Sequence, residues 1–288
     1  MRNYLCWAAS AILLASFWFA GCNFKTKTAF ENDIKWDSIH IEKTYHLQEN
    51  PDNPNCNLLI KFIFPVKYEN QAVLESIQQH FNRSCFGEPY EKLTPGGAIE
   101  RYVEQYIDEY KSLESDFLAE KKEEHDHEHE GAVHSWFSYY EYFANEITYN
   151  KNDLLCYAVS YENYTGGAHG SHSYMSYVID LKTGLSLKEK DFFVEGYQEP
   201  LSKILVKKIA EKNRAKDVSE LENMGFFSID EIYPNDNFSI DDNGITYYFN
   251  EYEIAAYVVG ITQVFLPYDE IRHLLSNDNR ITWLAGNQ

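Results

Sequence analysis

Three histidines in an acidic run are the first candidate ligands in this 288-residue sequence. His125, His127 and His129 lie within Glu-Glu-His-Asp-His-Glu-His-Glu at 123–130. On a helix the first and third would share a face, and in an extended segment all three would, an arrangement suited to zinc, nickel or copper. A tract of this composition is equally typical of a solvated loop. Because no second set of ligands is evident, we favour the loop, with His134 as an optional further ligand.

A glycine-rich segment, Tyr-Thr-Gly-Gly-Ala-His-Gly at 164–170, is the second candidate. Adjacent glycines allow positive φ angles and close approach of the backbone to a ligand. This predicts a ligand-contacting loop, with at least one glycine at positive φ, formed by Tyr164, Thr165, Gly166, Gly167 and His169. The alternative is a structural connection between strands in which His169 packs and bonds locally. We favour the alternative, since no nucleophile or carboxylate partner for this histidine is identifiable.

No catalytic fingerprint is present in the sequence. It lacks G-x-S-x-G, H-E-x-x-H, the P-loop pattern and G-x-G-x-x-G. The 45 acidic residues are too many to single out a glycosidase pair, which is defined by separation in space. We therefore expect no cofactor and favour a non-catalytic role, with an enzyme acting on cell-wall glycan or peptide and metal capture as alternatives.

The elements that position these residues follow from hydrophobic periodicity. Strands are expected at 38–47, 58–64, 136–142, 155–161, 174–181 and 262–266, with a hairpin over 238–249 around Asp-Asn-Gly. Helices are expected at 69–86, about 97–124, 198–212 and 267–275. Hairpins without regular βαβ alternation indicate an α+β fold with mainly antiparallel sheets, packed helices and two subdomains.

The first 22 residues predict export. Phe-Ala-Gly-Cys at 19–22 closes an apolar run that follows Arg2, and small residues directly before Cys22 are typical of a lipoprotein processing site. An uncleaved membrane span is the alternative. We expect a signal peptide at 1–21, acylation of Cys22 and a tether at 22–35. Asn23 after the cysteine favours the outer membrane if the cell is Gram-negative.

Two subdomains are expected after the tether, at 36–131 and 132–288. The net charge of −20 argues against nucleic acid and favours basic partners. Cys56, Cys85 and Cys156 remain beyond the leader and its lipidated cysteine. A disulfide between the first two is compatible with export, but we favour free, mostly buried thiols.

The segments at 164–170, 178–184 and 248–257, with Gly260, carry a family resemblance. They resemble the domain of unknown function in the extracellular region of the lysozyme-sensing anti-sigma factor RsiV. Residues 39–97 more weakly resemble the companion domain of the peptidoglycan deacetylase PdaC. The resemblance implies an envelope module without catalysis, which the lipid on Cys22 would hold at the membrane. It also implies a ligand that is a peptidoglycan component or a basic protein such as lysozyme.

Overall fold

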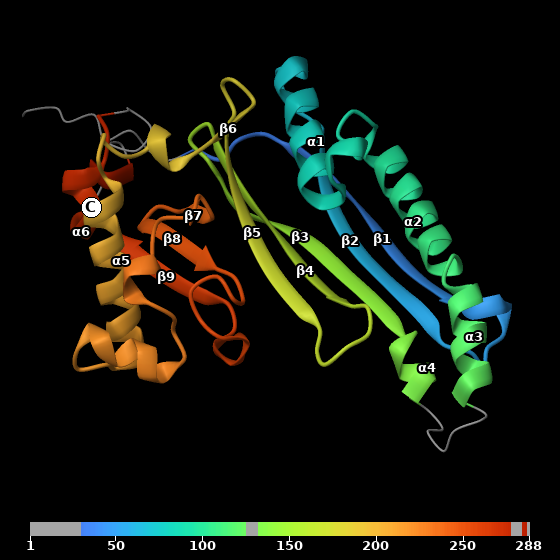
Figure 1. The fold of residues 1–288 in the computed structure, drawn as a ribbon. Helices are drawn as coiled ribbons and strands as arrows, with labels where there is room; N and C mark the ends of the chain where they lie inside the picture. Colours follow the sequence, from blue (N-terminus) through green and yellow to red (C-terminus); the bar gives the residue numbers. More distant parts are fainter. Residues whose placement is uncertain (1–29, 125–131, 278–283, 287–288) are drawn as a thin grey trace, which may run out of the picture.

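The computed structural model describes residues 30–124, 132–277 and 284–286 (Figure 1). It confirms the α+β class, with a six-stranded sheet in the order β1-β2-β3-β4-β5-β6 and a three-stranded sheet in the order β7-β8-β9. The strands of the first sheet are β1 (Lys35–His46), β2 (Asn55–Lys67), β3 (Tyr139–Lys151), β4 (Leu154–Tyr164), β5 (Ser171–Asp180) and β6 (Leu185–Leu187). Those of the second are β7 (Phe238–Ile240), β8 (Gly244–Phe249) and β9 (Thr262–Pro267).

Helices connect and cover these sheets. They are α1 (Gln71–Phe86), α2 (Pro95–Lys111), α3 (Glu114–Glu124), α4 (Ala132–Trp136), α5 (Gln198–Asn213) and α6 (Tyr268–Ile271). The first four lie between β2 and β3, which pair in parallel, whereas the other described pairs are antiparallel. A long helical crossover is what a parallel pair requires. Within the described residues, no helix has the length and apolar character needed to cross a membrane.

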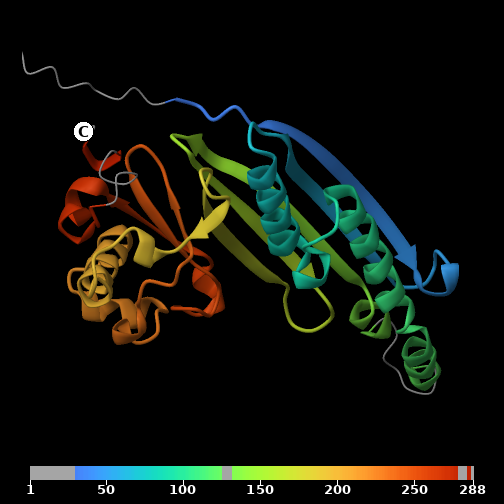
Figure 2. The ribbon, with the colours of Figure 1, turned by 90° about the horizontal axis from the view of Figure 1, so that it is seen from above.

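One face of the six-stranded sheet packs against α1 and α2, as the view in Figure 2 shows. Side chains alternate between the two faces of a strand, so Leu58, Ile60 and Phe62 of β2 all point to this side. They form one buried core with Ile77 and Phe81 of α1. The amphipathic pattern predicted for 69–86 is therefore the pattern that holds this helix on the sheet.

Among the described residues, those that cover the opposite face lie near β6 and along β5. There Leu154, Cys156 and Val178 belong to a second core that includes Leu205 of α5 and Phe238 of β7. The C-terminal sheet and α5 thus lie over one end of the large sheet (Figure 1). The remainder of this face carries the site described below.

The edge of β5 that faces away from β4 is joined to the C-terminal unit by side chains. The backbone N–H of Ser176 donates to Asn237 Oδ1 at 2.8 Å, that of Tyr174 donates to Asn250 Oδ1 at 2.7 Å, and that of His172 donates to Glu251 Oε2 at 3.1 Å. Asn237 also donates through Nδ2 to the carbonyl of Tyr174 at 2.8 Å. These side chains satisfy strand groups that would otherwise lie unpaired at the edge of the sheet.

The structure departs from the predicted boundaries at three places. The helix expected over about 97–124 is divided into α2 and α3 around Ser112, whose hydroxyl donates to the Glu109 carbonyl at 2.6 Å and competes with helical bonding. The tether expected at 22–35 ends earlier, because Asn32 and Ile34 are buried. The subdomain boundary expected near residue 131 falls inside the six-stranded sheet, because β2 lies before it and pairs with β3, which lies after it.

The three described cysteines are free, in agreement with the preference for buried thiols over a disulfide. Cys56 and Cys156 are fully buried, and Cys85 is partly buried. Burial raises the pKa of Cys56 to about 11 and that of Cys156 to about 12. Both therefore stay protonated at neutral pH and act as small apolar core residues.

Candidate functional site

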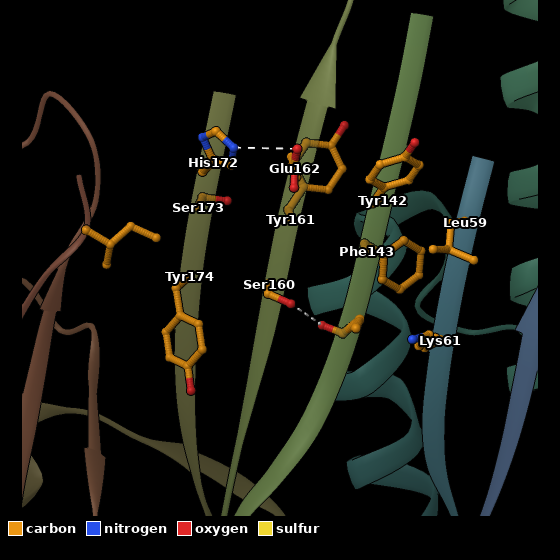
Figure 3. Close-up of a pocket in the computed structure, with 12 residues that line it drawn as sticks. Leu59, Lys61, Tyr142, Phe143, Ser160, Tyr161, Glu162, His172, Ser173 and Tyr174 are labelled. Carbon is orange, nitrogen blue, oxygen red and sulfur yellow. Dashed lines mark hydrogen bonds and ion pairs between the residues drawn. The ribbon is translucent and has the colours of Figure 1, made fainter. Parts of the chain in front are cut away.

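The uncovered part of the six-stranded sheet, called the open face here, presents aligned polar and aromatic side chains (Figure 3). Register places Leu59, Tyr142, Glu162 and His172 in one row across β2 to β5. The next row holds Lys61, Ala144, Ser160 and Tyr174. Alternation along each strand puts the members of both rows on the same side.

A ladder of tyrosines runs along one end of the open face. The ring centroids of Tyr140 and Tyr142 are 4.8 Å apart with an interplanar angle of 19°, and Tyr164 of the neighbouring strand stacks on Tyr140 at 6.0 Å. The side of Tyr142 toward solvent is accessible, with 37% of the residue exposed. Stacked, partly exposed aromatic rings form a flat apolar surface with hydroxyl groups at its edge.

His172 connects two carboxylates at the centre of the site. Its Nδ1 lies 3.0 Å from Glu251 Oε1, and its Nε2 lies 3.6 Å from Glu162 Oε1. Tyr140 donates its hydroxyl to the same Glu162 oxygen at 3.1 Å. The carboxylates come from β4 and from the segment after β8, so this contact joins the sheet to the C-terminal unit.

The C-terminal unit supplies one rim of the site. Tyr257, in the short 3-10 helix Tyr257–Val259, stacks on His169 with ring centroids 4.0 Å apart. Tyr252 bonds His169 Nε2 at 3.2 Å, while the other ring nitrogen of His169 lies 2.8 Å from the Gly170 carbonyl. His169 therefore packs and bonds locally, as in the favoured interpretation of its loop.

The loop at 164–170 borders the open face and confirms the predicted backbone geometry. Gly166 has φ +85° and Gly167 has φ +106°. Tyr164, itself part of the tyrosine ladder, donates its hydroxyl to the Gly167 carbonyl at 2.9 Å. A Cβ atom at Gly166 would lie 2.8 Å from the Trp136 carbonyl oxygen, whereas one at Gly167 would have no neighbour within 4 Å.

Gly166→Ala is therefore expected to lower the free energy of unfolding by about 1–3 kcal/mol, through positive φ combined with the collision at Trp136. Gly167→Ala should cost less, because only the backbone strain applies. Gly96→Ala, at an ordinary φ in α2 with open space around it, should cost nothing. Denaturant unfolding compares the three variants. Equal losses at the two loop positions would show that the close approach to Trp136 is unimportant.

A cavity of about 280 Å³ lies on the open face. Its floor includes Leu59, Ala144 and Tyr142, and Ile261 of the C-terminal unit also lines it. Polar atoms come from Lys61, Ser160, Glu162, His172 and Tyr174. The mixture of an apolar floor with a few polar groups around it is typical of small-ligand sites.

The candidate metal ligands receive no test from the structure. His125, His127 and His129 lie outside the described residues, and His134 lies in α4, where its Nδ1 is 3.3 Å from the Ser138 hydroxyl. No group of three histidine, cysteine or acidic side chains is placed to hold a metal ion in the part of the chain that the structure describes.

Sequence reasoning identified Tyr164 and His169 at the rim but missed the central residues. Tyr140 and Tyr142 had a usable signal, because tyrosines two positions apart in a strand share a face. No pattern in the sequence pointed to Glu162 and His172, because their proximity depends on the register of β4 and β5. Glu251 reaches them from 79 positions beyond His172 in the chain.

These features define an α+β protein that presents a tyrosine-lined sheet face beside a C-terminal antiparallel unit. The chain belongs to the DUF3298 family. It is 31% identical to a member of that family from Bacteroides fragilis NCTC 9343, known from its crystal structure, with a TM-score of 0.82. The similarity covers 89% of this chain and 99% of that one.

A DUF3298 family protein from Pseudomonas aeruginosa PAO1 shares the fold, with 14% identity and a TM-score of 0.59 over 86% of this chain and 96% of that one. Residues 190–269 match the family "Protein of unknown function (DUF3298)", and residues 49–172 match "Deacetylase PdaC". No curated protein matches the sequence.

These matches confirm the expected domain content but shift its division. The PdaC-like match extends to residue 172, beyond the resembling segment at 39–97 and beyond the subdomain end expected at 131, so it contains the loop at 164–170 and most of the open face. Glu251, Tyr257 and Ile261 belong to the DUF3298-matched part. The candidate site therefore lies where the two matched parts meet.

Proposed function

We propose that this protein is a non-catalytic binding protein of the bacterial envelope, and that its ligand is a cell-wall component held on the open face. The observation that carries the proposal is the solvent-accessible tyrosine ladder beside the cavity. Helices cover the opposite face of the same sheet, so exposure of these rings is not explained by core packing.

The interactions of the two carboxylates support binding over hydrolysis. A glycosidase needs one carboxyl group as proton donor and the other as nucleophile or base toward the sugar. Glu251 here accepts from the His172 backbone and contacts its ring, and Glu162 accepts from Tyr140. Glu251 thus fixes β5 against the C-terminal unit. An enzyme acting on cell-wall glycan or peptide is the second candidate function.

Anchoring by lipid is part of the proposal. Phe-Ala-Gly-Cys at 19–22 supports cleavage before Cys22 and acylation with palmitate-type chains, and Asn23 supports retention at the outer membrane of a Gram-negative cell. Mass spectrometry of the protein purified from its native membrane is expected to show a mature chain that starts at a lipidated Cys22. An unmodified mature start at another residue would contradict the anchor.

Tyr142→Ala tests the binding surface. Loss of an aromatic anchor costs a binding site more than about 1 kcal/mol, so the affinity for purified peptidoglycan sacculi should fall about tenfold. Co-sedimentation measures this affinity. Tyr233→Ala is the matched control, because Tyr233 is 54% exposed and lies outside the open face.

If Tyr142→Ala sediments with sacculi as the wild-type protein does, the open face is not the binding surface. If wild-type protein ignores sacculi but binds lysozyme at about 0.15 M salt, where screening is strong, the ligand is a basic protein, as the net charge of −20 also allows.

A further inference from the structure

We infer that the open face selects saccharides that carry free, protonated amino groups over the same saccharides with N-acetyl groups. The inference rests on the proposed function and names the ligand class of that site. It follows from the charge of the site, the shape of its floor and the groups left available for bonding.

Charge is the first argument. The carboxylate of Glu162 is 42% exposed, and its Oε1 is already engaged by Tyr140 and His172. In the described part of the chain, no hydrogen bond engages its Oε2. Lys61 is the one lysine or arginine among the residues that line the cavity. Glu146 adds a second carboxylate at the margin, where it accepts from the Tyr174 hydroxyl at 3.1 Å.

A protonated amine matches this arrangement. An ammonium group carries three donors and no acceptor, and its bond to a carboxylate is about twice as strong as a neutral hydrogen bond. The faces of neighbouring tyrosines also attract a cation. An acetamide carries no charge, so it would cover Glu162 and remove water from it without neutralising it.

The shape of the cavity favours a sugar as the carrier of that amine. The volume of about 280 Å³ is slightly below the usual range of about 300–1,000 Å³ for small-ligand sites, so it suits a unit as small as a sugar ring better than a folded protein surface. Leu59, Ala144 and Tyr142 offer an apolar floor for the C–H face of a pyranose ring. Ser160, Tyr174 and Lys61 lie around that floor, where they can bond the hydroxyl groups at the ring edge.

The test compares two glycans that differ only in acetylation. Calorimetry of the purified protein with a glucosamine tetramer and an N-acetylglucosamine tetramer, at about pH 6, is expected to show at least about tenfold tighter binding of the free amine form. Glu162→Gln should abolish the preference. Glu104→Gln, an exposed change on α2, should retain it.

Each outcome decides between the two proposals. Equal affinity for the two tetramers, or a preference that survives Glu162→Gln, overturns the amine inference and leaves the proposed binding function intact. Tetralysine bound as tightly as the glucosamine tetramer overturns the saccharide assignment. If the protein binds neither of the tetramers nor sacculi, the proposed function itself is wrong.

Discussion

Asn237→Ala is expected to lower the free energy of unfolding by about 2–4 kcal/mol. Asn237 is 2% exposed, and its side chain bonds both the N–H of Ser176 and the carbonyl of Tyr174, each at 2.8 Å. Alanine removes the partners of two backbone groups at a buried contact, and each unsatisfied group costs about 1–3 kcal/mol. Urea denaturation followed by circular dichroism measures the loss.

Asn57→Ala provides the matched control. Asn57 lies on the six-stranded sheet and makes two side-chain hydrogen bonds, to Thr44 at 2.7 Å and to Asn55 at 2.7 Å. Water can replace these bonds because the site is only partly buried, so the loss should stay below about 0.5–1 kcal/mol. If the two alanine variants lose the same stability, the side-chain contacts along β5 do not hold the C-terminal unit in place.

The contacts along β5 also bear on binding. Glu251 accepts from the same strand edge as Asn237 and at the same time contacts the His172 ring. Ile261, from the same C-terminal unit, lines the cavity. The side of the cavity that His172 and Ile261 form therefore depends on the docking of the C-terminal unit on β5.

Periodicity predicted most elements because it reports which face of a strand or helix is buried. The hairpin around Asp-Asn-Gly at 242–244 is present, with β7 and β8 on either side. The break between α2 and α3 was missed since the apolar spacing continues through Ser112. Burial of Asn32 was missed for a different reason: the bonds it makes are to Asn150, Asp153 and Leu154, about 120 positions away.

The site was less accessible to sequence reasoning than the fold. A glycine pair is visible in the sequence because it reports backbone conformation at one place. A cavity is different, because it depends on which strands are neighbours in the sheet and on which part of a sheet face the other elements do not cover. Parallel pairing of β2 with β3 brings Leu59 beside Tyr142, and no local pattern around either residue predicts that pair.

Glu141→Gln is expected to change how stability depends on pH. Glu141 is 6% exposed between the sheet and α2, where it accepts hydrogen bonds from the hydroxyls of Tyr102 and Tyr161. Burial raises the pKa of this carboxyl above its ordinary value of 4.5, in spite of those two bonds. The neutral carboxyl is thus favoured in the folded protein, and a glutamine side chain has nearly the same shape.

The sign of the effect follows from proton linkage. A group whose pKa is higher in the folded state contributes its full stabilisation below its unfolded pKa and loses it as pH rises through its folded pKa. The wild-type protein should therefore lose stability relative to Glu141→Gln as pH rises from about 4.5 through the raised pKa of Glu141. Glu189, whose pKa is also raised by burial, is the same in both proteins and cancels in the difference.

Urea denaturation of both proteins at a series of pH values between about 4 and 8 measures that difference. Glu104→Gln, at an exposed position of α2, should follow the wild-type profile, since its side chain is solvated in both states. A stability difference between wild type and Glu141→Gln that is constant with pH would mean that Glu141 titrates alike in the folded and unfolded chains. Its two tyrosine bonds would then offset the cost of burying its charge between the sheet and α2.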